Sequence, residues 1–206
     1  MSTSTDNSKC TTVSANSFFA LTSRMKYINR WGLMRNSRSE NIAEHSLDVA
    51  IIAHLLCELR NTRFGGNVNP ERAAVIAIFH DVPEIITGDL PTPVKYFSSD
   101  ISKAYKKVEA AAVDELVSQI PGDIAEDYRK ILAPDDSELA SLVKAADKIS
   151  ALIKCIEERK SGNNDFAQAE KQTMEAIKVM NLPEADLFIK EFLPAYELTL
   201  DEQTRK

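Results

Sequence analysis

Three histidines occur in this chain of 206 residues, few enough for each to be weighed as a ligand or a catalytic group. His45 lies in a stretch with helical periodicity, on the same face as its apolar residues, and we expect it to point into the core. His80 ends an apolar run and is followed directly by Asp81. His54 falls on the opposite face from His45, and we expect it at the surface without a role. The apolar residues that share the face of His45 are Val49, Ile52 and Leu56.

A second carboxylate, Asp147, stands within a later helical pattern at the edge of its apolar arc. A half-buried aspartate inside a helix disfavours folding unless something compensates its charge, and a divalent cation would do so. Two imidazoles and two carboxylates form a mixed nitrogen and oxygen donor set that suits Mn²⁺, Co²⁺, Fe²⁺ or Zn²⁺. Taken singly, each residue is more often structural, since an inward histidine is usually a hydrogen-bonded core residue. Only the combination predicts a metal site.

The elements that must position these residues are helices. From Phe18 onward the chain shows helical periodicity with short polar breaks and no sustained apolar and polar alternation. Pro70 opens the most apolar stretch, which we expect to be the central buried helix, and Pro83 marks a break or restart after Asp81. Residues 89–93 read as a loop stiffened by prolines. The expected helices cover about 17–27, 41–60, 70–80, 99–119, 124–132, 138–160, 165–180 and 183–196.

No linker divides these helices, so the sequence predicts an all-α fold, a single-domain helical bundle over residues 17–206. A polar stretch at 1–16 has almost nothing to bury, and we expect a disordered tail there. The three cysteines, Cys10, Cys57 and Cys155, form no CxxC pair, which favours free thiols in a reducing compartment.

Charge and hydropathy exclude several classes of protein. The formal net charge is −6 and the sequence pI about 5.2, which argues against a partner that is a nucleic acid polymer. The longest purely apolar run, 73–79, is too short to cross a membrane, and the N-terminus lacks the apolar core of a signal peptide. We therefore expect a cytoplasmic protein with no membrane partner.

An isolated histidine, a later His-Asp pair and a distant aspartate, here His45, His80-Asp81 and Asp147, form the pattern of the HD-domain metal-dependent phosphohydrolases. The flanking residues are more specific. Runs such as INRW at 28–31, EHSL at 44–47 and TGDLPTPVKYF at 87–97 resemble the bacterial 5′-deoxynucleotidases of that superfamily. The resemblance extends from about Phe18 to Glu202 and implies a helical bundle of the HD-domain type. It also implies an enzyme, a homodimer, that hydrolyses deoxyribonucleoside 5′-monophosphates to deoxynucleoside and phosphate.

The same resemblance implies roles for individual residues. One divalent cation, with Co²⁺ and Mn²⁺ as candidates, would be bound by His45, His80, Asp81 and Asp147. Arg30 and Trp31 would meet the phosphate and the sugar, with Arg30 orienting the phosphate for catalysis, and Glu84 would position or activate the attacking water. The loop against the sugar, which helps to reject a 2′-hydroxyl, consists of Asp89, Leu90, Pro91 and Thr92. Substrate contacts are also expected from His45, Asp81 and Asp147.

Two other readings stay open. A non-catalytic metal or nucleotide sensor would keep the metal site for stability, although such a site would often lose an auxiliary residue like Glu84. Another HD chemistry, such as a dNTP triphosphohydrolase, would release tripolyphosphate and usually belongs to a larger chain. A bimetallic phosphodiesterase would need further histidines after His80, and the sequence has none.

Overall fold

The computed structural model describes residues 16–204, and within them it contains helices and no β-strand. Apart from Asn16, the predicted tail at 1–16 lies outside the described residues, as does Cys10. The α-helices are α1 (Phe18–Thr22), α2 (Ile42–Arg63), α3 (Pro70–Phe79), α4 (Glu84–Thr87), α5 (Thr92–Lys95), α6 (Ser99–Ser118), α7 (Ala125–Leu132), α8 (Ser137–Lys160), α9 (Ala167–Val179), α10 (Pro183–Glu191) and α11 (Leu200–Thr204). The 3₁₀ helices are η1 (Ser23–Tyr27), η2 (Asn164–Phe166) and η3 (Leu193–Glu197). The all-α prediction is confirmed.

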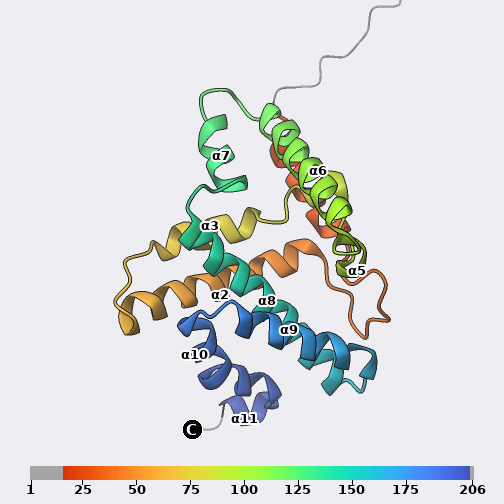
Figure 1. Ribbon diagram of the computed structural model, residues 1–206, viewed down its shortest axis with the longest axis vertical. Helices are drawn as coiled ribbons and strands as arrows, with labels where there is room; N and C mark the ends of the chain where they lie inside the picture. Colours follow the sequence, from red (N-terminus) through yellow and green to blue (C-terminus); the bar gives the residue numbers. More distant parts are fainter. Residues whose placement is uncertain (1–15, 205–206) are drawn as a thin grey trace, which may run out of the picture.

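The long helices α2 and α8 cross the middle of the molecule, with α3 beside them (Figure 1). The helices α6 and α7 lie at one end with the N-terminal elements, and α9 to α11 lie at the other. None of the helices in the described part of the chain is long and apolar enough to cross a membrane.

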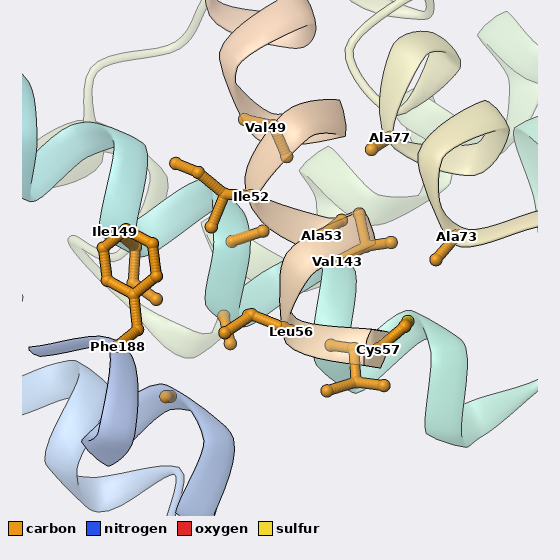
Figure 2. Close-up of a cluster of buried hydrophobic side chains, with 14 of the residues drawn as sticks. Val49, Ile52, Ala53, Leu56, Cys57, Ala73, Ala77, Val143, Ile149 and Phe188 are labelled. Atoms are coloured by element: carbon orange, nitrogen blue, oxygen red, sulfur yellow. The ribbon is translucent and has the colours of Figure 1, made fainter. Parts of the chain in front are cut away.

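The main core forms where α2 meets α8, and it confirms the predicted apolar face of α2. Ile52 and Leu56 of α2 are almost completely buried and gather with Ile149 of α8 and Phe188 of α10 (Figure 2). Full burial of a leucine or isoleucine side chain contributes about 1.5–3 kcal/mol to folding. This contact fixes the relative positions of the two helices that carry His45 and Asp147.

The expectation that the 70–80 helix is the central buried one is wrong. Within α3 the small residues Ala73 and Ala77 are fully buried, whereas Ile78 is 43% exposed. The helix has ten residues and packs along one side of α2 and α8, so its outer face meets solvent despite its apolar composition. His54, expected at the surface, is instead half-buried.

Several expected boundaries shift. The first helix changes to 3₁₀ geometry after Thr22, and α2 continues to Arg63. The last long helix ends at Glu191, because Pro194 has no N–H group and cannot continue it, and η3 follows. The proline loop contains one helical turn, α5, which begins at Thr92. The predicted break at Pro83 is confirmed, since turns at 80–83 separate α3 from α4.

A second apolar cluster holds the turn at 80–83. Val82 is fully buried there and packs with Phe18 of α1, Ile42 of α2 and Leu116 of α6. Because Val82 directly follows the His-Asp pair, this cluster fixes the place of that pair opposite the start of α2.

Candidate metal and substrate site

Three elements that are far apart in the sequence bring the four predicted metal ligands together. His45 lies in the first turns of α2, which begins where the Asn41 side chain accepts hydrogen bonds from the amides of Ala43 and Glu44. The His-Asp pair lies in the turn after α3, and Asp147 lies in the middle of α8. The helix start and the buried turn therefore place the donors on one side of the α2–α8 contact.

The distances within this cluster are short. Ligand atoms of His45, His80 and Asp81 lie within 4.8 Å of one another. Asp147 joins them through His45, whose Nε2 lies 3.0 Å from Asp147 Oδ1 and 3.7 Å from Asp81 Oδ2. Asp81 Oδ1 in turn lies 3.2 Å from His80 Nε2. Three of the four predicted donors, His45, His80 and Asp81, thus form one compact cluster, and Asp147 lies next to it through its contact with His45.

His80 is oriented as a ligand. Its Nδ1 donates a hydrogen bond to the carbonyl of Ala77 at 2.7 Å, which leaves the lone pair on Nε2. That Nε2 atom is buried and has no hydrogen-bond partner among the described residues. A buried nitrogen without a partner costs free energy. Histidines that bind a metal through one ring nitrogen typically donate a hydrogen bond from the other, as His80 does to the Ala77 carbonyl. The residues therefore fit a divalent cation.

His45 is fully buried and lies between the metal donors and Arg30. Arg30 Nη1 lies 2.6 Å from His45 Nδ1, and on the other side of the ring Nε2 donates to Asp147. Desolvation alone would raise the pKa of Asp147, but the hydrogen bond from His45 and the charges of His45 and Arg30 hold it well below its usual range. Asp147 is therefore ionised, as a ligand must be. If Nε2 were deprotonated to bind a cation, a proton on Nδ1 could be donated in a hydrogen bond to Ser150 Oγ or Glu40 Oε1, which lie 3.1 and 3.4 Å from Nδ1.

Glu84 is close enough to Asp81 for their charges to interact, although the two residues do not lie on one continuous helix. The helix breaks after Phe79, and Glu84 is the first residue of the restarted helix α4. Burial, and then the negative charges of Asp81 and Asp89, raise the pKa of the Glu84 carboxyl to about 9. Its Oε2 atom is buried and has no partner among the described residues. This crowding of acidic groups is a condition that a divalent cation relieves.

Of the loop expected to contact the sugar, Asp89 to Thr92, only Asp89 interacts with the other site residues in the described chain. Asp89 is half-buried and accepts a hydrogen bond from the backbone amide of Trp31, and burial is the main cause that raises its pKa. Within residues 16–204, no hydrogen bond or ion pair joins Leu90, Pro91 or Thr92 to the metal donors. Leu90 and Pro91 are half-buried beside Asp89, while Thr92 is exposed at the start of α5.

The sequence reasoning missed Glu40, which organises the substrate side of the site. Its Oε1 lies 3.1 Å from Arg30 Nη1, and its Oε2 accepts a hydrogen bond from the indole nitrogen of Trp31 at 2.9 Å. Burial alone would raise the pKa of Glu40, but the hydrogen bond with His45 and the charge of Arg30 lower it. No periodicity marks this residue, because it directly precedes the Asn41 cap in an irregular segment.

Trp31 has an unusual backbone conformation. Its φ angle is +60°, a region that bulky residues seldom occupy, and such strain is found most often at functional positions. The indole ring packs against Phe166 of η2 with centroids 5.1 Å apart. Trp31 is half-buried, so part of it remains open to a ligand.

A cavity of about 260 Å³ opens at the metal donors, where His80 and Asp147 form part of its wall. The rest of the wall is mostly apolar, with one cation, Lys144, one turn before Asp147. The further lining residues are Ile76, Ile131, Leu132, Pro134, Ala140 and Val143. The metal donors are therefore reachable by a small molecule.

The helical fold and this donor set define a phosphohydrolase of the HD-domain class, and solved structures agree with that assignment. An HD-domain phosphohydrolase from Listeria innocua superposes with a TM-score of 0.77 at 25% identity, covering 87% of this chain and 88% of that one. The HD phosphohydrolase DatZ of cyanophage S-2L, solved with dA and one catalytic Zn²⁺ ion, superposes with a TM-score of 0.60 at 23% identity. That match covers 87% of this chain and 96% of DatZ and supports the fold.

Sequence comparison gives the particular family. The model of the 5′-deoxynucleotidase YfbR-like family matches residues 17–196, and the chain belongs to that family. A curated 5′-deoxynucleotidase of Vibrio vulnificus is 49% identical over 187 residues, which cover 90% of this chain and 96% of the relative. A 5′-deoxynucleotidase of Vibrio cholerae is 48% identical over the same shares of both chains. The resemblance stated from the sequence is confirmed.

Proposed function

We propose that this protein removes phosphate from deoxyribonucleoside 5′-monophosphates, using one divalent cation bound by His45, His80, Asp81 and Asp147. The family membership and the names of the Vibrio relatives agree with the predicted activity, that of a 5′-deoxynucleotidase. The observation that carries the proposal for the site is the buried His80 Nε2, which has no hydrogen-bond partner in the described chain and faces a carboxylate within the cluster.

A divalent cation at these residues supplies two things: it lowers the pKa of a bound water from about 15.7 toward 7, and it screens the charge of the phosphoryl oxygens. Co²⁺ and Mn²⁺ are our candidates, because the donors are imidazole nitrogens and carboxylate oxygens without thiolates. The two free cysteines of the described chain, Cys57 and Cys155, are buried elsewhere.

Arg30 binds and orients the phosphate in this proposal. Its side chain is 14% exposed and lies between Glu40 and Asp147, whose nearest oxygen is 3.8 Å from Nη2. A guanidinium stays charged and can donate to two phosphate oxygens at once. The phosphate is therefore held next to the metal donors, with its two negative charges opposed by the cation and by Arg30.

The water is assigned to Glu84 and the sugar to Asp89 and Trp31. Glu84 orients the attacking water, because its carboxyl lies beside Asp81 and has one oxygen without a partner among the described residues. Asp89 accepts a hydrogen bond from the 3′-hydroxyl of deoxyribose, and Trp31 forms a wall next to it. Leu90, Pro91 and Thr92 complete the loop that would crowd a 2′-hydroxyl.

The test is release of inorganic phosphate from dAMP, AMP and dATP after chelation and re-addition of Co²⁺, Mn²⁺, Mg²⁺ or Zn²⁺. We expect metal-dependent turnover of dAMP and little turnover of AMP. Tripolyphosphate from dATP would instead indicate a triphosphohydrolase. A rise in melting temperature with metal but no turnover of any substrate would indicate a sensor and contradict the proposed activity.

We further propose that the protein is a cytoplasmic homodimer that binds free nucleotides rather than a nucleic acid polymer. The net charge of −6 supports the last point, since binding to phosphate backbones requires clustered cations. Light scattering coupled to size-exclusion chromatography would contradict the dimer if it gave a mass near 22.9 kDa, that of one chain.

A further inference from the structure

The segment from Arg30 to Glu40, which we call the substrate segment, carries residues proposed to bind the phosphate and to face the sugar, and it contains no helix and one hydrogen-bonded turn, at 31–34. Its two ends are joined, because the Arg30 amide donates to the Glu40 carbonyl at 2.9 Å and an isolated bridge pairs Asn29 with Asn41. Residues between those ends have no regular backbone ladder. Their position therefore depends on contacts with other parts of the chain.

One buried carboxylate makes two of these contacts. Glu158, near the end of α8, is 2% exposed. Its Oε2 accepts hydrogen bonds from the Ser37 amide and from Asn163 Nδ2, both at 2.8 Å. Its Oε1 accepts from the Arg38 amide at 3.3 Å and from Lys154 Nζ. Two consecutive amides of the substrate segment are thus fixed by a single buried side chain.

Lys154 and Asn163 hold the carbonyls of the same segment. Lys154, one turn before Glu158 and 7% exposed, donates to the Arg38 carbonyl at 2.6 Å. Asn163, 3% exposed, donates to the Arg35 carbonyl, also at 2.6 Å. The η2 turn that follows Asn163 carries Phe166, the packing partner of Trp31. The far end of the segment is therefore held from α8 and η2.

A buried ion pair such as Lys154 with Glu158 is a poor device for stability. Desolvating two charges often costs as much as their attraction returns, and an apolar pair of the same volume is frequently as stable. Here the pair does more than neutralise its own charges, because Glu158 and Lys154 also form hydrogen bonds with the backbone of the substrate segment.

We propose that Glu158 and Lys154 are positioning residues for the substrate: they hold the segment so that Arg30 and Trp31 face the metal donors. Neither residue touches the proposed substrate, and both act through the segment. The inference rests on the proposed function for its kinetic consequence, while its structural consequence is independent of activity.

The experiment replaces the whole pair with apolar residues, Lys154→Met together with Glu158→Leu, in the full-length protein. The buried charges disappear together, so we expect a melting temperature within a few degrees of the wild type. The amides of Ser37 and Arg38 lose their acceptors, so we expect faster hydrogen exchange confined to residues 31–39. For dAMP we expect KM to rise about tenfold with a smaller change in kcat, and unchanged affinity for Mn²⁺.

A matched control is another largely buried ion pair, Arg60 with Glu184, which joins α2 to α10 away from the segment. The variant Arg60→Met with Glu184→Leu should leave the KM for dAMP and exchange at 31–39 unchanged. The positioning role is overturned if the Lys154 and Glu158 double variant keeps wild-type KM and wild-type exchange in the segment. It is also overturned if that variant loses Mn²⁺ affinity and exchanges faster throughout, since the pair would then be structural. A wild type that does not hydrolyse dAMP would instead overturn the proposed function, and exchange at 31–39 would still decide this inference.

Discussion

Glu40 Oε1 lies 3.1 Å from Nη1 of Arg30, and both side chains are nearly buried, at 12% and 14% exposed. The same carboxylate accepts the indole N–H of Trp31 through its other oxygen. Glu40 therefore orients both the Arg30 guanidinium, which we propose binds the phosphate, and the Trp31 ring, which we propose lies against the sugar. Glu40 does this from the position directly before Asn41, the N-cap of the helix that carries His45.

Replacing Glu40 with glutamine tests this arrangement. The amide keeps an oxygen that can accept from Trp31, but it has no charge to hold Arg30. We expect the KM for dAMP to rise about tenfold, equivalent to about 1.4 kcal/mol of lost binding, with metal affinity little changed. Steady-state kinetics at saturating Mn²⁺ measure this effect.

The matched control is Glu44→Gln, one turn further along. Glu44 is an exposed glutamate whose partner, Arg38, lies 3.5 Å away. Exposed pairs of this kind contribute at most about 1 kcal/mol, so we expect little change in KM. Equal kinetic effects of the two substitutions would argue against an organising role for Glu40.

Metal removal gives a second prediction, which does not depend on turnover. A cation that binds only the folded state at 100 times its Kd stabilises it by about 2.7 kcal/mol. For a chain of this size we expect the melting temperature to rise by about 5–10 °C when Mn²⁺ is added to chelated protein. His80→Ala and Asp81→Ala should each abolish most of that rise, whereas His54→Gln should retain it. If Mn²⁺ raised the melting temperature of the wild type and of all three variants equally, the cation would bind at a different site.

Much of this architecture could be predicted from the sequence because the signals are local. Periodicity identified the inward face of α2, and Pro83 marked the break after the His-Asp pair. Periodicity does not say which helix is central: α3 has the most apolar composition but too few residues to be enclosed, so Ile78 meets solvent.

The missed part of the site depends on contacts between irregular segments. Glu40 lies outside any helix, and Glu158 is a charged residue near the end of α8 whose contacts with the Ser37 and Arg38 amides form only when α8 meets the irregular segment at 30–40. The metal donors were easier to identify, because their residue types are rare and the resemblance named them. Such a resemblance does not show which side chains orient the donors.

Arg30→Lys separates charge from geometry. Lysine keeps the positive charge but cannot donate to two phosphate oxygens in a fixed plane. We expect kcat/KM for dAMP to fall about 100-fold, which corresponds to about 2.7 kcal/mol of transition-state stabilisation. The rise in melting temperature with Mn²⁺ should persist, since Arg30 is not a ligand. Wild-type kcat/KM in this variant would contradict a bidentate contact with phosphate.

Asp89→Asn tests the sugar contact. The amide oxygen can still accept from the Trp31 amide, so the backbone arrangement is kept while the charge is lost. We expect kcat/KM for dAMP to fall about tenfold and the preference for dAMP over AMP to narrow. Thr92→Ser, at the exposed end of the same loop, serves as the comparison and should leave the preference close to wild type. An unchanged ratio of dAMP to AMP turnover in the Asp89 variant would remove this aspartate from sugar recognition.

Acid stability reports on Glu158. Burial alone would raise its pKa, but hydrogen bonds from Lys154, Asn163 and the Ser37 amide lower it to about 2. A carboxylate whose pKa is lowered by folding stabilises the folded state above its unfolded pKa of about 4.3 and loses that contribution as the pH falls toward the folded value. We therefore expect the stability difference between wild type and Glu158→Gln to be largest above pH ~4.5 and to shrink as the pH approaches 2. Urea unfolding of metal-free protein across this range measures it, and a difference that stays constant with pH would show that Glu158 titrates alike in the folded and unfolded chains.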